Sequence, residues 1–266
     1  MIGLSIRLSD RLVDFPKHST VCFIHAWAVN NWAQIVDSQL KRLSSSGLYQ
    51  KLDAIFLNIV TGQIHDTSRI EADLAWLGID QYDDTLQYVI KPDADECEKS
   101  SLLWLHEYST VNKQDVRVLY FHTKGVRHHG QATESNVTDW RNMLETLLIN
   151  HHSLALECLA KVDVCSLQYT PSAVTFAGNF WWAHSSYLKE LNADIQAVCP
   201  AHPYIAQELW ILSKHEAIFC DLFQSGLDAA AAGHYYNPFP SSRIPTHFTP
   251  IFYKKTGRHA EPWNIP

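Results

Sequence analysis

Short apolar runs alternate with helical patterns along the chain. Residues 19–30 and 53–62 are apolar runs rich in Val, Ile and Phe, and residues 31–47 between them space apolar side chains three and four positions apart. Unbroken apolar runs are typical of strands buried on both faces, and the wider spacing is typical of a helix. We place the N-cap of this helix at Asn31 and its end at Gly47. Strand, helix and strand in this order predict a βαβ unit with parallel strands.

The same alternation continues to about residue 223. We predict further strands at residues 86–92, 115–125, 163–170, 173–183 and 215–223, and helices at residues 96–110, 138–162 (one long or two short), 185–191 and 205–214. The chain from about residue 234 is dense in Pro and aromatic residues, which predicts an irregular segment packed on the domain. We therefore expect a single domain over residues 1–266, of class α/β, a three-layer α/β/α sandwich with a mostly parallel central sheet.

Composition narrows the class of protein. Hydrophobic residues make up 46% of the chain and charged residues 18%, as expected of a well-filled core. The net charge of −7 would repel nucleic acid, so we expect no nucleic-acid partner and only a local anion site. The six cysteines lack metal-ligand spacing, which favours buried thiols in a reducing compartment. We find no signal peptide or apolar membrane span and expect a cytoplasmic protein, with peripheral membrane association left open.

Polar residues gather where two of the predicted strands end. The first strand carries His25 and is followed by Asn30. The central strand ends in His122, Thr123, Lys124 and Gly125. Ligands of open α/β sheets bind outside the carboxyl ends of the strands, so we expect these side chains to line one crevice. Lys124 is a candidate anion ligand, with a surface lysine in a turn as the alternative, and His25 has a structural alternative too.

Further candidates lie in the second half of the chain. Gly178 and Asn179 interrupt an apolar run and fit either a ligand contact or a β-bulge. Trp181 and Trp182 are adjacent, so in a strand at most one of them faces a ligand. Glu208 lies in a predicted helix among apolar neighbours, where a carboxylate is unusual without a partner or a function.

Common catalytic motifs are absent from the sequence. The fifteen histidines include two adjacent pairs, but no H-E-x-x-H spacing occurs, so no metal site is predicted from spacing. The sequence also has no G-x-S-x-G elbow, P-loop or G-x-G-x-x-G fingerprint. The sequence therefore contains none of the motifs that usually indicate a serine hydrolase, a P-loop NTPase or a Rossmann dehydrogenase.

Several segments in order resemble one family. "CFIHAWAVNNW", "YFHTKG", "DWRNMLE", "FAGNFWWAHSSYL" and "QELWI" run from about residue 22 to residue 211. They are similar to glycosyltransferase-like proteins with a Y-x-H-T-K-G strand end, a W-R-x-x-M helix and an F-(S/A)-G-N-F-W-W-A segment. That family looks like a variant of the GT-A fold, a Rossmann-like nucleotide-diphospho-sugar transferase. The resemblance implies an enzyme of polysaccharide or glycan biosynthesis that moves a sugar from a nucleotide-sugar donor to a carbohydrate or related acceptor.

The resemblance also implies catalytic roles. Glu208 falls where inverting GT-A enzymes often carry their base. Where those enzymes have an Asp-x-Asp metal motif, the central strand ends in His122, Thr123 and Lys124 instead. A departing diphosphate needs positive charge, which a metal or cationic side chains supply. We therefore expect Lys124, with His122 and Arg141, to take that role.

The other candidates are expected to bind substrate. They are His25, Asn30, Thr123, Gly125, Gly178, Asn179 and either Trp181 or Trp182, whose ring would stack on a sugar. No cofactor is predicted, although Mn²⁺ or Mg²⁺ stays open, with Asp80, Asp83, Asp84 and His247 as candidate ligands. Two alternatives are a metal-dependent hydrolase using the His-rich segments and a catalytically silent carbohydrate-binding or scaffold protein.

Overall fold

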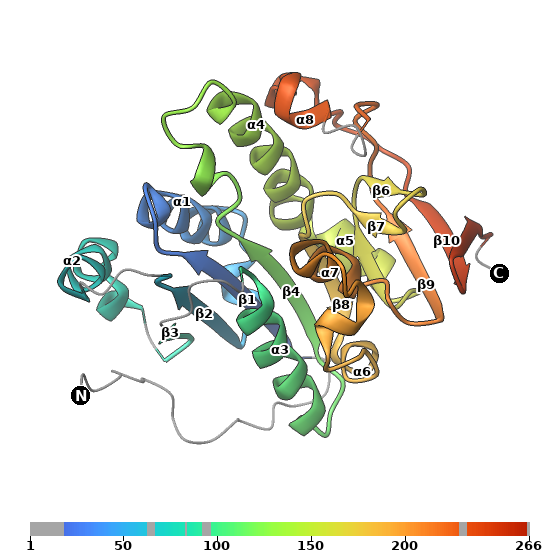
Figure 1. Cartoon of the computed structure of the whole chain (residues 1–266), viewed down its shortest axis with the longest axis horizontal. Coiled ribbons are helices and arrows are strands. Elements are labelled where there is room, and N and C mark those ends of the chain that lie inside the picture. The colour runs from blue at the N-terminus through green and yellow to red at the C-terminus, as the bar shows by residue number, and fades with distance from the viewer. Residues whose placement is uncertain (1–18, 63–66, 83, 92–96, 229–232, 265–266) are drawn as a thin grey trace.

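The computed structural model describes residues 19–62, 67–82, 84–91, 97–228 and 233–264 (Figure 1). The strands are β1 (Thr20–Trp27), β2 (Ala54–Val60), β3 (Leu86–Lys91), β4 (Arg117–His122), β5 (Val164–Ser166), β6 (Tyr169–Thr170), β7 (Thr175–Phe176), β8 (Trp181–His184), β9 (Glu216–Asp221), β10 (Ile251–Thr256) and β11 (His259–Pro262). The α-helices are α1 (Trp32–Ser45), α2 (Thr67–Leu77), α3 (Lys99–Val111), α4 (Glu134–Glu145), α5 (His152–Leu159), α6 (Ser185–Leu188), α7 (Pro203–Trp210) and α8 (Gly233–Tyr236). A π-helical turn, η4 (Thr146–Asn150), joins α4 to α5.

The predicted α/β class is confirmed, but the central sheet is mixed. In the described part of the chain, its nine strands have the order β11-β10-β9-β5-β8-β4-β1-β2-β3. β1 runs parallel to β2 and β4, whereas β8 runs antiparallel to both β4 and β5. β10 and β11 add two antiparallel pairings at one edge. β5 pairs with β9 in parallel, so the half built from residues after β4 is mixed, and the expected mostly parallel sheet is confirmed only in part.

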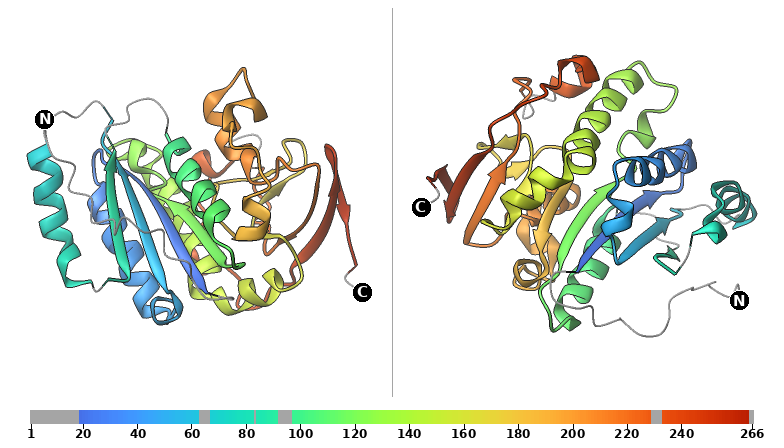
Figure 2. Two further views of the ribbon diagram at one scale, coloured as in Figure 1. Left: turned by 90° about the horizontal axis from the view of Figure 1, so that it is seen from below. Right: turned by 180° about the vertical axis from the view of Figure 1, so that it is seen from behind.

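The sheet has a separate core on each face, which gives three layers. Cys22 and Ile24 of β1 pack with α1, α2, α4 and α5, whereas Val21 and Phe23 pack with α3, α6 and α7. Successive side chains of a strand point to opposite faces, so a strand covered on both sides needs an unbroken apolar run. In Figure 2 the sheet lies between these two groups of helices.

The predicted strand over residues 173–183 is interrupted. β7 ends at Phe176, and β8 begins at Trp181 after a turn in which Gly178 and Asn179 have φ angles of +102° and +53°. A Cβ atom at Gly178 would lie 2.7 Å from a methyl carbon of Leu144, so this turn requires glycine for its space and its conformation.

The segment from about residue 234 is more regular than predicted. It begins in α8 and ends in the β10–β11 hairpin, whose turn places Gly257 at a φ angle of +62°. β10 pairs with β9, which is therefore not the last strand of the sheet. The helix α2 was not predicted from the sequence.

The ends of β1 and β4 form the edge of the sheet that matters most here, called the carboxyl edge below. His25 and His122 are register partners on these parallel strands. The backbone N–H of Thr123 donates to the His25 carbonyl over 2.9 Å, and its hydroxyl accepts from the Trp27 N–H over 3.1 Å. β8 starts at the same edge, because it is antiparallel to β4. The two strand ends are thus locked together beside the β7–β8 turn.

Candidate functional site

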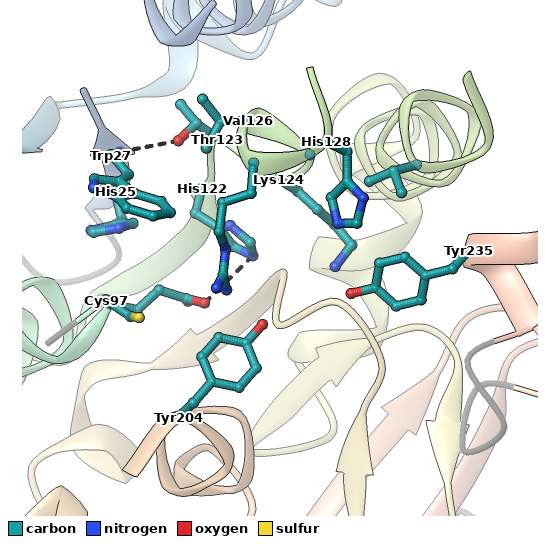
Figure 3. Close-up of a pocket in the computed structure, with 14 residues that line it drawn as sticks. His25, Trp27, Cys97, His122, Thr123, Lys124, Val126, His128, Tyr204 and Tyr235 are labelled. Atoms are coloured by element: carbon teal, nitrogen blue, oxygen red, sulfur yellow. Dashed lines mark hydrogen bonds and ion pairs between the residues drawn. The ribbon is translucent and has the colours of Figure 1, made fainter. Parts of the chain in front are cut away.

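A pocket with about 70 Å³ of internal space opens at the carboxyl edge (Figure 3). Its walls come from elements far apart in the sequence: the ends of β1 and β4, the start of α3, α7 and the α8 region. The side chains used in the argument below are His25, Trp27, Glu98, His122, Lys124, Arg127, Tyr204 and Tyr235. Ligands of open α/β sheets bind at this edge, so the position agrees with the sequence-based expectation.

Lys124 is a buried cation that makes no direct contact with a carboxylate of the described residues. Its side chain is only 7% exposed, and Nζ lies 3.6 Å from the centre of the Trp140 ring. No hydrogen bond joins Nζ to another described residue. Burial lowers the pKa of Lys124 to about 8, although the charges of Glu208 and Glu98 oppose this shift. The ammonium is therefore mostly charged at neutral pH and available to a ligand.

Arg127 is a second cation at the pocket, and it was not among the site residues predicted from the sequence. Its guanidinium carbon lies 5.4 Å from the centre of the Trp27 ring and 5.3 Å from that of Tyr204. Within the described part of the chain, the guanidinium makes no hydrogen bond or ion pair. Two aromatic rings thus hold its position while its donors remain open.

Glu98 is a buried carboxylate that was not recognised from the sequence. It directly precedes α3 and is 5% exposed. Its Oε2 accepts hydrogen bonds of 2.8 Å from the Tyr120 hydroxyl and the Asn179 side-chain amide, and Oε1 lies 3.7 Å from Nε2 of His122. Burial raises the pKa of Glu98. The sequence did offer a sign of this site: Glu98 is an acidic residue at the start of an apolar helix, and that helix follows a strand.

Helix α7 brings Glu208 into electrostatic contact with Lys124. Tyr204 and Glu208 are four residues apart, so they share a face of the helix. Burial raises the pKa of Glu208, while the Lys124 charge and hydrogen bonding from the Tyr204 hydroxyl favour its ionised form. A carboxylate with a raised pKa beside two unpaired cations is suited to proton transfer.

Of the three described histidines that line the pocket, the two carried by β1 and β4 are neutral at physiological pH. Nδ1 of His25 lies 2.8 Å from the Ser101 hydroxyl, and burial lowers the pKa of His25 to about 4. Nε2 of His122 donates to the Gly178 carbonyl over 3.0 Å, and burial lowers the pKa of His122 to about 3. The expectation that His122 supplies positive charge was therefore wrong, since its protonated form would be desolvated beside Lys124.

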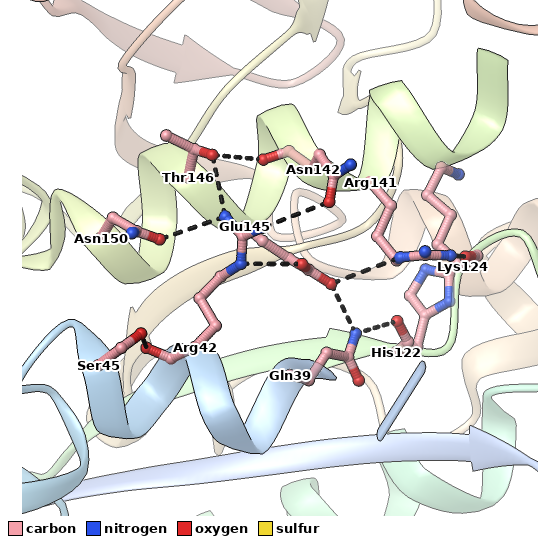
Figure 4. Close-up of polar contacts among 10 residues, drawn as sticks. All are labelled: Gln39, Arg42, Ser45, His122, Lys124, Arg141, Asn142, Glu145, Thr146 and Asn150. Atoms are coloured by element: carbon pink, nitrogen blue, oxygen red, sulfur yellow. Dashed lines mark hydrogen bonds and ion pairs between the residues drawn. The ribbon is translucent and has the colours of Figure 1, made fainter. Parts of the chain in front are cut away.

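Arg141 lies behind the pocket rather than in it (Figure 4). Its Nη1 donates to the backbone carbonyl of Lys124 over 2.7 Å, and its Nε lies 3.7 Å from Glu145. Gln39 donates to both the His122 carbonyl and Glu145 over 3.0 Å. The predicted phosphate contact of Arg141 is thus replaced by a structural role, because its donors hold the turn after β4.

Neither tryptophan of the "FWWA" segment lines the pocket. Trp181 and Trp182 are both 0% exposed and pack in the cores on opposite faces of the sheet. The indole N–H of Trp181 donates to Asn179, and that of Trp182 donates to the Leu148 carbonyl. The prediction that they face opposite ways is confirmed, but β8 is covered on both faces, so neither ring can stack on a sugar.

The remaining candidates divide between the pocket and its support. Thr123 and Gly125 line the pocket. Asn30 is exposed and instead donates its side-chain amide to a backbone carbonyl of the β4–α4 connection over 2.8 Å. Gly178 and Asn179 do not line the pocket but support residues that do. The Gly178 carbonyl accepts a hydrogen bond from His122, and the Asn179 side-chain amide donates one to Glu98.

The described pocket residues do not fit a divalent metal ion. Among the described residues, no group of three or more His, Cys, Asp or Glu side chains is arranged to hold a metal. Mn²⁺ and Mg²⁺ prefer several oxygen ligands, whereas Glu98 and Glu208 share their surroundings with cations. Asp83 lies outside the described residues. So does an Asp-x-Asp triplet, Asp93 to Asp95, which was overlooked in the sequence.

The fold and site define an α/β protein with a mixed-charge pocket at its carboxyl edge. The chain belongs to the family described as domain of unknown function (DUF8361), whose model matches residues 22–196. A search of curated proteins finds no match. The matched residues include most of β1, all of β4 and Glu98 but end before Tyr204 and Glu208. No helix in the described ranges is both long and apolar enough to cross a membrane.

Proposed function

We propose that this protein is a glycosyltransferase with a GT-A-like fold, which moves a sugar from a nucleotide-sugar donor to a carbohydrate or glycan acceptor. One observation carries the proposal: Lys124 and Arg127 have no acceptor among the described residues and lie beside the carboxylate Glu208. Their place at the carboxyl edge is where open α/β sheets bind ligands. The motif resemblance in the sequence supports the same class of enzyme.

The two cations suit the diphosphate of a nucleotide sugar. Negative charge builds up on the diphosphate as the bond to the sugar breaks, and preorganised donors stabilise it at that stage. Lys124 is buried, which strengthens its attraction for phosphate, whereas Arg127 offers a planar fork suited to two phosphate oxygens. Since no step needs a metal in this arrangement, the cations of the chain itself carry the proposed charge stabilisation.

Glu208 is the proposed base. Deprotonating an acceptor hydroxyl needs a carboxylate whose pKa is raised toward the working pH, and burial raises the pKa of Glu208 in this direction. Tyr204 and Lys124 hold this carboxylate by hydrogen bonding and charge. One base acting on the acceptor suffices for transfer with inversion, which we therefore propose.

Aromatic side chains at the pocket replace the tryptophans expected from the sequence. Trp27, Tyr204 and Tyr235 line the pocket from three separate elements. Aromatic rings complement the apolar C–H face of a pyranose, and Tyr hydroxyls add hydrogen-bonding capacity. We propose that these rings, rather than Trp181 or Trp182, contact the sugar.

The test is turnover of a panel of nucleotide sugars. Release of nucleoside diphosphate would be measured with and without simple glycan acceptors, in buffer containing Mn²⁺ and in buffer containing EDTA. A bound donor at a hundred times its Kd should add about 2.7 kcal/mol to the free energy of unfolding, so a thermal shift identifies it first. Binding without turnover would favour the silent carbohydrate-binding alternative. Failure of every nucleotide sugar and nucleoside diphosphate to bind would overturn the proposal.

A further inference from the structure

Glu98 is a pocket residue that the proposed transfer step does not use. It lines the pocket at 5% exposure and is more deeply buried than Glu208, which is not among the lining residues. Its two oxygens differ. Oε2 already accepts two hydrogen bonds, from Tyr120 and Asn179, whereas no described residue donates a hydrogen bond to Oε1. The 3.7 Å from Oε1 to Nε2 of His122 is too long for one, and that nitrogen donates to a backbone carbonyl.

Charged and titratable groups face Glu98 from every element packed around it. They are His25 of β1, Tyr120 and His122 of β4, Lys124 after β4, and Tyr204 and Glu208 of α7, together with the neutral amide of Asn179. His25 and His122 are neutral. The negative charges of Glu98 and Glu208 are therefore close to balanced by the positive charges of Lys124 and Arg127. A dianion added beside the cations leaves this small space with excess negative charge.

We propose that binding of a dianion at Lys124 and Arg127 is coupled to the uptake of one proton from solvent by Glu98, whose Oε1 then donates a hydrogen bond into the pocket. This inference rests on the anion site of the proposed function and adds a proton to it. A like charge close to a carboxylate disfavours its ionised form, and burial already raises the pKa of Glu98. A protonated Glu98 no longer repels the dianion and can donate a hydrogen bond to it.

The bonding pattern favours Glu98 over its neighbours as the proton acceptor. Protonation at Oε1 leaves both hydrogen bonds to Oε2 in place, so it costs no existing contact. Protonating His25 or His122 requires a larger change, because burial lowers their pKa values to about 4 and about 3. Glu208 is stabilised as an anion by Lys124 and by the Tyr204 hydroxyl, which lies on its own helix.

Sulfate is the probe of choice, since it is a dianion that does not itself titrate near neutral pH. Isothermal titration calorimetry at about pH 6.5, in two buffers of different ionisation enthalpy, counts the protons taken up per sulfate bound. We expect on the order of half to one proton for the unmodified protein and close to none for Glu98→Gln. The amide is neutral at every pH, so Glu98→Gln should bind sulfate at least as tightly as the unmodified protein, with the advantage growing as pH rises.

Glu208→Gln is the matched control and should keep the proton uptake. Loss of uptake in Glu208→Gln with retention in Glu98→Gln would overturn the inference, as would sulfate binding by the unmodified protein without uptake. The infrared band of a protonated carboxylic acid, appearing on sulfate addition to the unmodified protein and missing in Glu98→Gln, tests the same point. Should Glu98→Gln not fold, absence of that band in the unmodified protein would suffice to overturn it.

The same titrations separate this inference from the proposed function. Sulfate binding that Lys124→Ala weakens, but that takes up no proton, removes the role of Glu98 and leaves the anion site intact. Absence of sulfate binding, or binding that Lys124→Ala does not change, removes the anion site and with it both proposals.

Discussion

Two clusters of opposite charges lie on either side of the turn after β4, and their charges are paired to very different degrees. In the cluster behind the turn, Arg42 directs Nε to Glu145 over 3.2 Å and Nη1 to the Thr146 hydroxyl over 3.0 Å (Figure 4). In the pocket, Lys124 and Arg127 pack against aromatic rings and donate to no described side chain. The charges of the first cluster are paired within the protein, whereas the two pocket cations contact no carboxylate of the described residues.

The difference separates residues that hold the structure from residues available for function. A buried charge without hydrogen-bonding partners costs free energy, so a fold keeps it only when another benefit compensates. The cluster behind the turn also donates hydrogen bonds to the backbone. Gln39 donates to the carbonyl of His122, and Arg141 donates to the carbonyl of Lys124. One cluster therefore fixes the turn from which the other presents its lysine.

The largest effect on stability is expected from breaking the cluster behind the turn, which is centred on Glu145. Glu145 is 0% exposed and lies between Arg42, Arg141 and Gln39, so Glu145→Ala leaves buried donors without an acceptor. We expect the free energy of unfolding to fall by about 3–5 kcal/mol, measured by urea denaturation. Glu145→Gln keeps the shape and should lose less. A loss below about 1 kcal/mol for Glu145→Ala would remove the structural role from this cluster.

The pocket should respond in the opposite way, through activity rather than stability. Glu208→Gln removes the proposed base while keeping its shape, so we expect roughly a hundredfold loss of turnover with donor affinity retained. Stability should change by less than about 1 kcal/mol, because Glu208 is only partly buried. The exposed Glu107 of α3 offers a control, and Glu107→Gln should leave turnover unchanged. Full turnover in Glu208→Gln would remove this residue from the mechanism.

Much of the fold was predictable because its first half follows simple periodic patterns. β1, α1, β2, α3 and β4 were all recognised, since strands buried on both faces read as apolar runs and α1 has regular apolar spacing. The half of the sheet built after β4, where parallel and antiparallel pairings mix, was harder to predict. A turn at Gly178 and Asn179 divides one apolar run, and β10 lies in a Pro-rich region without an alternating apolar pattern.

The site was predictable only in part, for a similar reason. The turn from His122 to Gly125 was found because an unusual polar run directly follows a buried strand. Glu98 and Tyr204 join it from distant elements, and no local pattern reports such contacts. Residue type also could not separate an arginine that binds backbone carbonyls, Arg141, from one with open donors, Arg127.

Lys124 allows the comparison to be sharpened by pH. Lys124→Ala removes the buried ammonium, and we expect at least a tenfold loss of affinity for nucleoside diphosphate, as for a charge-assisted hydrogen bond of about 1.5–3 kcal/mol. Burial lowers the pKa of Lys124 to about 8, so turnover should fall as pH rises above that value and the ammonium loses its proton.

Lys124→Arg is the matched variant for that pH profile. A guanidinium does not titrate in this range, so the alkaline fall should disappear, while geometry limits the recovery of turnover. The profile would be measured as kcat against pH in a series of overlapping buffers. An unchanged alkaline limb in Lys124→Arg would assign it to another group.

The smallest effect is expected at Arg127, where solvent screens the charge. Arg127 is exposed, so Arg127→Ala should weaken nucleoside diphosphate binding by about 1 kcal/mol, or roughly fivefold, without changing the unfolding free energy. The loss should shrink at high salt, because exposed charges are screened over about a Debye length. Arg258→Ala removes an equally exposed arginine that is not among the pocket residues and should leave affinity unchanged. Equal losses of affinity in Arg127→Ala and Arg258→Ala would mean that Arg127 acts only through the overall charge of the protein. The guanidinium of Arg127 would then not be a ligand contact.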